Sequence, residues 1–154
     1  IEKKDVISYG HDIEAAWLLL RCAEIVEDEK LISNYKKHAI QIAEVTKEGI
    51  DHDGGLWYEY DPETNELMAE KHWWPQAELM IGYFTAWQLS GKQEYLDVVF
   101  KNWDFTKKHI IDKENGEWFW GVLSDYSKIQ KDKAGFWKCP YHNSRACIEL
   151  INRI

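Results

Sequence analysis

The 154-residue sequence predicts an all-α fold, namely part of an α/α toroid in which short β-hairpins separate successive helix pairs. The first observation is an internal repeat: Gly55 and Trp57 recur 61 residues later as Gly116 and Trp118. The second is that each repeat contains one helix pattern that opens with polar or aromatic residues and one that is amphipathic. Such pairs predict inner helices around a funnel, covered by outer helices. A plain helical bundle with accidental periodicity is the alternative.

Apolar residues that recur every three or four positions predict five helices. The expected ranges are 11–28, 30–49, 74–90, 93–111 and 141–154. The first helix is apolar enough to be largely buried, and its expected inward residues are Ile13, Trp17, Leu20, Ala23 and Ile25. Gly49 and Gly91 are expected to end the second and third helices. Pro75 lies in the first turn of the third, where its missing N–H costs nothing.

Turn residues followed by alternating aromatics predict a short hairpin between residues 51 and 72. Residues 112–125 repeat the same turn-plus-aromatic theme. Residues 125–135, which are rich in Lys, Asp and Ser, are expected to form a solvated loop.

Charge and composition exclude several classes of function. The net charge of −8 argues against nucleic acid and anionic membranes as partners, since both are polyanions. No apolar run is long enough to span a bilayer. The three cysteines are odd in number and lack metal-type spacing, which favours a reducing, cytoplasmic location. The chain starts at Ile1 within a globular pattern, and we expect it to be a piece of a longer protein.

Nine tryptophans are more than an ordinary core requires. Some could simply pack between helices, because each aromatic side chain buries a large area. The alternative is a sugar site, in which indoles stack on pyranose faces and acidic side chains accept hydrogen bonds from hydroxyl groups.

Candidate site residues gather at three helix starts. His11, Glu14 and Trp17 are spaced by three and so share one helix face. Trp74 and Glu78, four apart, share a face of the next such helix. His142 opens the last helix, and Trp137 lies in the loop before it. Each residue alone has an ordinary structural explanation, but together they indicate one shared pocket.

The other histidines, His38, His52, His72 and His109, have no such context and are expected at the surface or in loops. No metal site is predicted, because the sequence has neither a His-x-x-x-His pair on a helix face nor paired cysteines.

Four stretches, GHDIEAAW, KHWWPQAE, ENGEWFWGV and KAGFWKCPYHNSRA, resemble the N-acylglucosamine 2-epimerase superfamily, most closely its cellobiose (disaccharide) 2-epimerase branch. The resemblance implies an (α/α)6 barrel with its active site at the barrel mouth. Residues 1–154 would be the C-terminal portion of that single domain, with the N-terminal portion absent.

The resemblance also implies a function: epimerisation at C2 of the reducing-end residue of a β-1,4-linked disaccharide, through an enediol(ate). His11 and His142 match the two catalytic histidines. Five residues match carboxylates and indoles that bind substrate: Glu14, Trp17, Trp74, Glu78 and Trp137. No cofactor or metal is implied, and the partner is a small carbohydrate. The missing N-terminal half, or another chain, would be needed to close the barrel, and the isolated fragment would be inactive.

Two other functions are compatible with the residues. Glu14 and Glu78 could be the acid and base of a glycoside hydrolase on the same toroid. The chain could also be a non-catalytic carbohydrate-binding fragment. The histidines at the helix starts weigh against hydrolysis by carboxylates alone.

Overall fold

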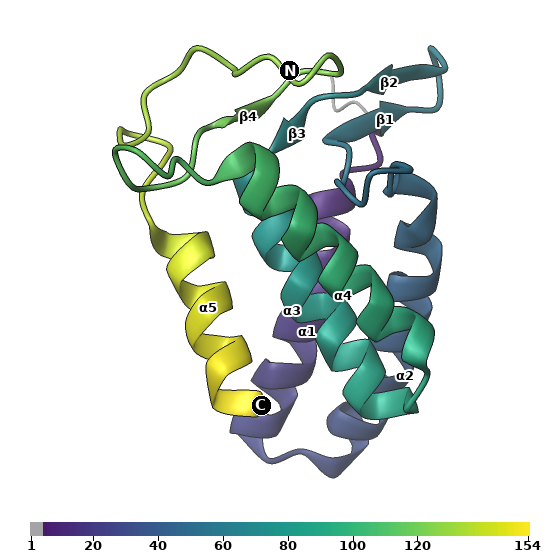
Figure 1. Cartoon of the computed structure of the whole chain (residues 1–154). Helices are drawn as coiled ribbons and strands as arrows, with labels where there is room; N and C mark the ends of the chain where they lie inside the picture. Colours follow the sequence, from purple (N-terminus) through teal and green to yellow (C-terminus); the bar gives the residue numbers. More distant parts are fainter. Residues whose placement is uncertain (1–4) are drawn as a thin grey trace.

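The computed structural model describes residues 5–154 and contains five α-helices. The first four residues of the predicted domain lie outside the described part. The helices are α1 (Tyr9–Val26), α2 (Glu29–Thr46), α3 (Trp73–Ser90), α4 (Gln93–Phe105) and α5 (Tyr141–Arg153). Their order confirms the predicted all-α class (Figure 1). Within the described residues, no helix combines the length and hydrophobicity needed to cross a lipid bilayer.

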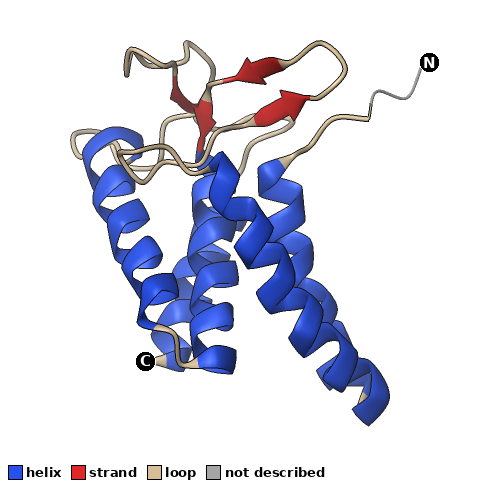
Figure 2. Ribbon diagram, turned by 90° about the vertical axis from the view of Figure 1, so that its right-hand side faces the viewer, coloured by secondary structure: helices blue, strands red, loops and turns tan. Residues whose placement is uncertain are grey.

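The α3 helix is the centre of the molecule. It contacts each of the other four helices, and every residue from Trp73 to Ala86 is buried. A helix whose surface is mostly apolar needs such a position. The α1 and α5 helices flank it, while α2 and α4, which are amphipathic, cover it from outside (Figures 1 and 2). This is the predicted alternation of inner and outer helices.

Two glycines allow the inner helices to approach closely. A Cβ atom at Gly82 of α3 would lie 2.5 Å from Cγ1 of Ile13 on α1. A Cβ atom at Gly10 of α1 would lie 2.5 Å from Cη2 of Trp74 on α3. Larger side chains at either position would push α1 and α3 apart.

Most predicted helix ends lie within two residues of the observed ones. The second helix ends earlier than expected, at Thr46, and continues as a 3-10 turn (Lys47–Gly49). The fourth ends at Phe105 and continues as a π-helical turn (Thr106–Ile110). Gly91 ends α3 with a φ of +70°, the left-handed conformation that glycine adopts readily. Ile25, predicted to face inward, is 70% exposed because it lies in the last turn of α1, beyond the packed core.

Strands lie at one end of the helices, between successive helix pairs (Figure 2). Strands β1 (Glu59–Asp61) and β2 (Glu66–Met68) form the predicted hairpin. Strands β3 (Lys71–His72) and β4 (Gly121–Val122) pair antiparallel across the two repeats. The second aromatic segment therefore pairs mainly with β3 of the preceding repeat, a contact between repeats that the pattern within one repeat does not encode.

Two buried lysines form ion pairs with the loops that connect the helices. Lys71 is 2% exposed, and its ammonium group lies 2.5 Å from Asp51 Oδ2 and 2.6 Å from Asp53 Oδ2. Lys138 is equally buried and donates to Glu117 Oε1, 3.0 Å away, and to two backbone carbonyls. Each lysine lies just before an inner helix. The two repeats therefore also share a buried lysine that pairs with carboxylates.

One prediction about the histidines is wrong. His72 was expected at the surface or in a loop, but it is only 6% exposed, because it belongs to the buried strand β3. Its ring lies 4.1 Å from that of Tyr58 and 6.3 Å from that of Trp120, and its Nε2 lies 2.6 Å from Glu70 Oε2. Burial lowers the pKa of His72, although Glu70 acts to raise it.

Candidate active site

The starts of α1, α3 and α5 lie at the end of the bundle that carries the strands (Figure 1). This arrangement brings together six of the seven predicted site residues: His11, Glu14, Trp17, Trp74, Glu78 and His142. The ring of the seventh, Trp137, packs against Phe136.

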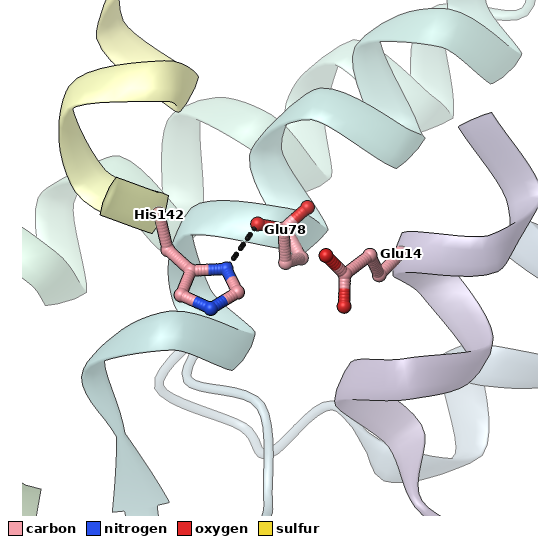
Figure 3. Close-up of side chains that lie close together, drawn as sticks. All are labelled: Glu14, Glu78 and His142. Atoms are coloured by element: carbon pink, nitrogen blue, oxygen red, sulfur yellow. Dashed lines mark hydrogen bonds and ion pairs between the residues drawn. The ribbon is translucent and has the colours of Figure 1, made fainter. Parts of the chain in front are cut away.

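Glu78 is the centre of the cluster. It projects from α3, is completely buried, and accepts hydrogen bonds from two neighbouring helices. Trp17 Nε1 of α1 donates to its Oε2 at 3.0 Å. His142 Nδ1 of α5 lies 2.7 Å from its Oε1 (Figure 3). Because a carboxylate only accepts hydrogen bonds, Nδ1 of His142 carries the proton and Nε2 is the basic nitrogen.

Arg145, which the sequence analysis did not single out, completes the cluster. Its Nη2 lies 2.6 Å from Glu78 Oε1 and 2.7 Å from Glu14 Oε1, so one guanidinium joins two carboxylates. Its planar group also lies 4.9 Å from the centre of the Trp17 ring. Burial acts to lower the pKa of Arg145, but its hydrogen bonds to Glu78 and Glu14 raise it overall. The sequence signal was present: Arg145 follows His142 by three residues on one helix face.

The two predicted catalytic histidines face the same indole. The ring of Trp74 lies 4.6 Å from that of His11 and 5.6 Å from that of His142. His11 Nδ1 is 2.7 Å from the hydroxyl of Ser8. Among the described residues, each imidazole is therefore held through Nδ1, which leaves Nε2 available to a ligand.

The two remaining indoles occupy different environments. Trp17 is 3% exposed, and its ring is covered by Arg145, so it supports Glu78 from beneath and does not offer a free face to a sugar. Trp137 is 81% exposed, packs edge-on against Phe136, and lines a separate surface hollow with Trp120 and Lys131.

Glu14, Glu78 and His142 also have the spacing of metal ligands, since one ligand atom from each lies within 4.8 Å of the others. The guanidinium of Arg145, however, already pairs with both carboxylates. The positive charge that this cluster requires is therefore supplied by a side chain.

An apolar cavity lies in another part of the molecule. It has a volume of about 560 Å³, lies between α3, α4 and α5, and has an almost wholly apolar lining that includes Phe84, Trp103 and Ile151. It shares no lining residue with the cluster around Glu78.

Comparison with known proteins identifies the family. The model of the N-acylglucosamine 2-epimerase (GlcNAc 2-epimerase) family matches residues 3–146. Cellobiose 2-epimerase of Bacteroides fragilis is 44% identical over 150 residues, which are 97% of this chain and 38% of that protein. The chain thus spans about two fifths of the length of the curated relatives it matches.

Solved structures agree with the sequence comparison. A sugar epimerase from a ruminal bacterium matches 99% of this chain with a TM-score of 0.92 and 37% identity. Cellobiose 2-epimerase from Spirochaeta thermophila matches 99% with a TM-score of 0.88 and 37% identity. In both, this chain covers 39% of the solved chain. The predicted fold is therefore confirmed: the helices are part of an α/α barrel.

Proposed function

Because the chain belongs to the N-acylglucosamine 2-epimerase family, we propose that it is the C-terminal portion of a sugar isomerase. The proposed reaction is epimerisation at C2 of the reducing-end residue of a β-1,4-linked disaccharide such as cellobiose. Residues 1–154 form part of one barrel domain, and the activity belongs to the complete protein. The three free cysteines fit a cytoplasmic location, which is part of the proposal.

One observation carries this proposal: two imidazoles, each held through Nδ1, lie against a single indole. Reversible epimerisation needs a base and an acid that can exchange roles, and imidazole titrates near neutral pH. Two such groups beside one binding surface can act on the same carbon atom, one removing its proton and the other returning one.

The chemistry follows from the partners of each histidine. With the sugar ring open, Nε2 of His142 removes the C2 proton alpha to the aldehyde, and the electron pair forms the enediolate. Glu78 stabilises the imidazolium that results, because its carboxylate accepts from Nδ1. Rotation about C2–C3 presents the other face, and His11, held by Ser8, returns a proton to C2. Exchange of the two roles gives the reverse reaction.

Three further residues have supporting roles in the proposal. Trp74 is the floor against which the reacting sugar lies. Glu14 orients a hydroxyl group of the substrate while it remains paired with Arg145. Trp137 stacks on the second sugar ring from the exposed loop before α5. Groups that stabilise the enediolate charge come in part from the remainder of the protein.

The geometry weighs against glycoside cleavage by Glu14 and Glu78. A glycosidase needs one carboxyl group that can protonate the leaving oxygen and a second that reaches the sugar or a water molecule. Glu78 is completely buried, and both carboxylates are already paired with one arginine.

Deuterium exchange tests the function. The complete protein in heavy water with cellobiose should place deuterium at C2 and form the C2 epimer. Release of monosaccharide would instead indicate a hydrolase. Sugar binding without exchange in the complete protein would indicate a non-catalytic module and contradict the proposal.

A further inference from the structure

We propose that Arg145 is a positioning residue that supplies the positive charge opposite Glu78 and Glu14, so that His142 remains a neutral base. This role rests on the proposed function, because it concerns the base of that reaction. Arg145 acts through Glu78 and does not itself contact the reacting carbon.

Arg145 and His142 share one hydrogen-bond acceptor, Oε1 of Glu78. Arg145 Nη2 and His142 Nδ1 both approach Oε1 of Glu78, at 2.6 and 2.7 Å, while Trp17 takes Oε2. Two groups able to carry positive charge therefore face one buried carboxylate oxygen. Only the guanidinium is charged at every physiological pH, whereas the imidazole can be neutral or charged.

The buried environment makes this division of charge important. A carboxylate with no exposed surface is strongly disfavoured unless a cation compensates it. If Arg145 were absent, the nearest group able to supply that cation would be His142. An imidazolium cannot accept the C2 proton, so the catalytic base would be lost over the working pH range.

Glu14 adds a second negative charge that requires a cation. Its carboxylate comes from α1 and lies on the other side of Arg145, 2.7 Å from Nη2 (Figure 3 shows it turned toward Glu78). Among the described residues, the charged and titratable groups around His142 are thus Glu78 from α3, Glu14 from α1, and Arg145 and Tyr141 from its own helix, with His11 across Trp74. Removing the guanidinium leaves two carboxylates beside one imidazole, which favours protonation of the imidazole.

The orientation of Arg145 is fixed by its other contacts. Nη1 donates to the hydroxyl of Tyr141, and the guanidinium lies 4.4 Å from the centre of that ring. The Trp17 ring lies 4.9 Å away. A planar fork with two N–H directions suits this place, and the single ammonium group of lysine does not reproduce it.

Arg153 provides a matched control. It lies on the same helix, and its guanidinium lies 6.0 Å from the same Trp17 ring. Its hydrogen bonds, however, go to Thr85 and Glu149 and not to Glu14 or Glu78. Replacing Arg153 removes a similar amount of side chain without changing the charge beside His142.

The experiment measures the protonation midpoint of the His142 imidazole by NMR in the complete protein, together with the pH profile of C2 exchange on cellobiose. In Arg145→Met, the midpoint should rise by about one pH unit or more, and the acid limb of kcat/KM should move with it. Arg153→Met should keep both at their original pH. Arg145→Lys should keep the midpoint, because the charge remains, and lose turnover, because the fork is lost.

An unchanged His142 midpoint in folded Arg145→Met would overturn the proposal. If Arg145→Met fails to fold, a raised midpoint in Arg145→Lys would overturn it instead, since charge would not be the controlling quantity. The NMR midpoint needs no turnover. Absence of C2 exchange in the unaltered protein would therefore count against the proposed function alone, while the midpoint would still decide the role of Arg145.

Discussion

His142 Nδ1 lies 2.7 Å from Oε1 of Glu78, although the two residues are 64 positions apart and belong to different inner helices. The bond fixes the tautomer of the imidazole and places a buried negative charge behind it. The chemistry of the site therefore depends on how α3 and α5 pack as much as on the presence of the histidine.

Replacing Glu78 by Gln should lower kcat by about 10²-fold and leave KM nearly unchanged. The amide has almost the shape of the carboxylate but cannot stabilise the imidazolium that forms when the C2 proton is removed. Because Glu78 is completely buried, substrate affinity should depend little on it. Steady-state kinetics on cellobiose in the complete protein measures both constants.

Glu149→Gln is the control for this change, since Glu149 lies on α5 and pairs with Arg153, away from His142. Its kcat should remain within twofold of the unaltered protein. Equal losses in the two variants would mean that the charge of Glu78 has no special role.

Replacing Ser8 by Ala should reduce turnover by up to about tenfold, the equivalent of one lost hydrogen bond. Ser8 occupies the residue before α1, but its side chain makes no capping bond and instead contacts Nδ1 of His11. The free energy of unfolding should therefore change by less than about 0.5 kcal/mol. Ser8→Thr keeps the hydroxyl and should keep most of the activity, and a Thr variant as slow as the Ala variant would argue against this bond.

Replacing Gly10 by Ala should displace the indole shared by the two histidines. The added methyl group would lie 2.5 Å from Cη2 and 2.7 Å from Cζ3 of Trp74. Overpacking of this kind costs about 1–3 kcal/mol of stability, and activity should fall by more than that loss of folded protein explains. Gly135→Ala, where nothing lies within 4 Å, should change neither melting temperature nor C2 exchange.

Replacing Lys71 by Met should destabilise the fold by about 3–5 kcal/mol, because two partly buried carboxylates lose their shared cation. Denaturant unfolding measures the loss. Lys37→Met, at an exposed position of α2, should cost less than about 0.5 kcal/mol. Similar effects of the two substitutions would contradict the role assigned to Lys71.

The same ion pair predicts how stability depends on acid. Burial acts to raise the pKa of Asp51, but hydrogen bonds from Lys71 and His52 lower it to about 2, below the ordinary value of 3.8. A depressed folded-state pKa stabilises the native chain above the ordinary value, and this contribution is lost as pH falls from about 4 to about 2. Unfolding free energies measured across that range should fall less steeply in Asp51→Asn.

The helices were predictable because their signals are local. The apolar positions of α1 identify that helix and its burial, and Pro75 and Gly91 mark the two ends of α3. The convergence of three helix starts followed from the repeat. The π-helical turn after Phe105 and the early end of α2 did not follow, since both depend on packing against neighbouring segments.

The candidate site was predictable in membership and less so in arrangement. Spacing on a helix face grouped Glu78 with Trp74 in the candidate site, and Glu78 is buried. Arg145 and His72 were missed because their contacts come from other segments, such as Glu14 for Arg145 and Tyr58 for His72. Trp137 is the opposite case, because its sequence motif alone indicates a site residue. Its role in sugar stacking remains a prediction.

The buried ammonium groups of Lys71 and Lys138 lie just before α3 and α5. Each pairs with acidic residues of a loop that connects two helices, and so fixes that loop to the start of the following helix. Because these ion pairs are buried, substitutions on the outer surface of the loops should leave them intact. We therefore expect substitutions at exposed residues of this surface, such as Phe136, 92% exposed, and Lys131, to leave the contacts around Glu78 unchanged.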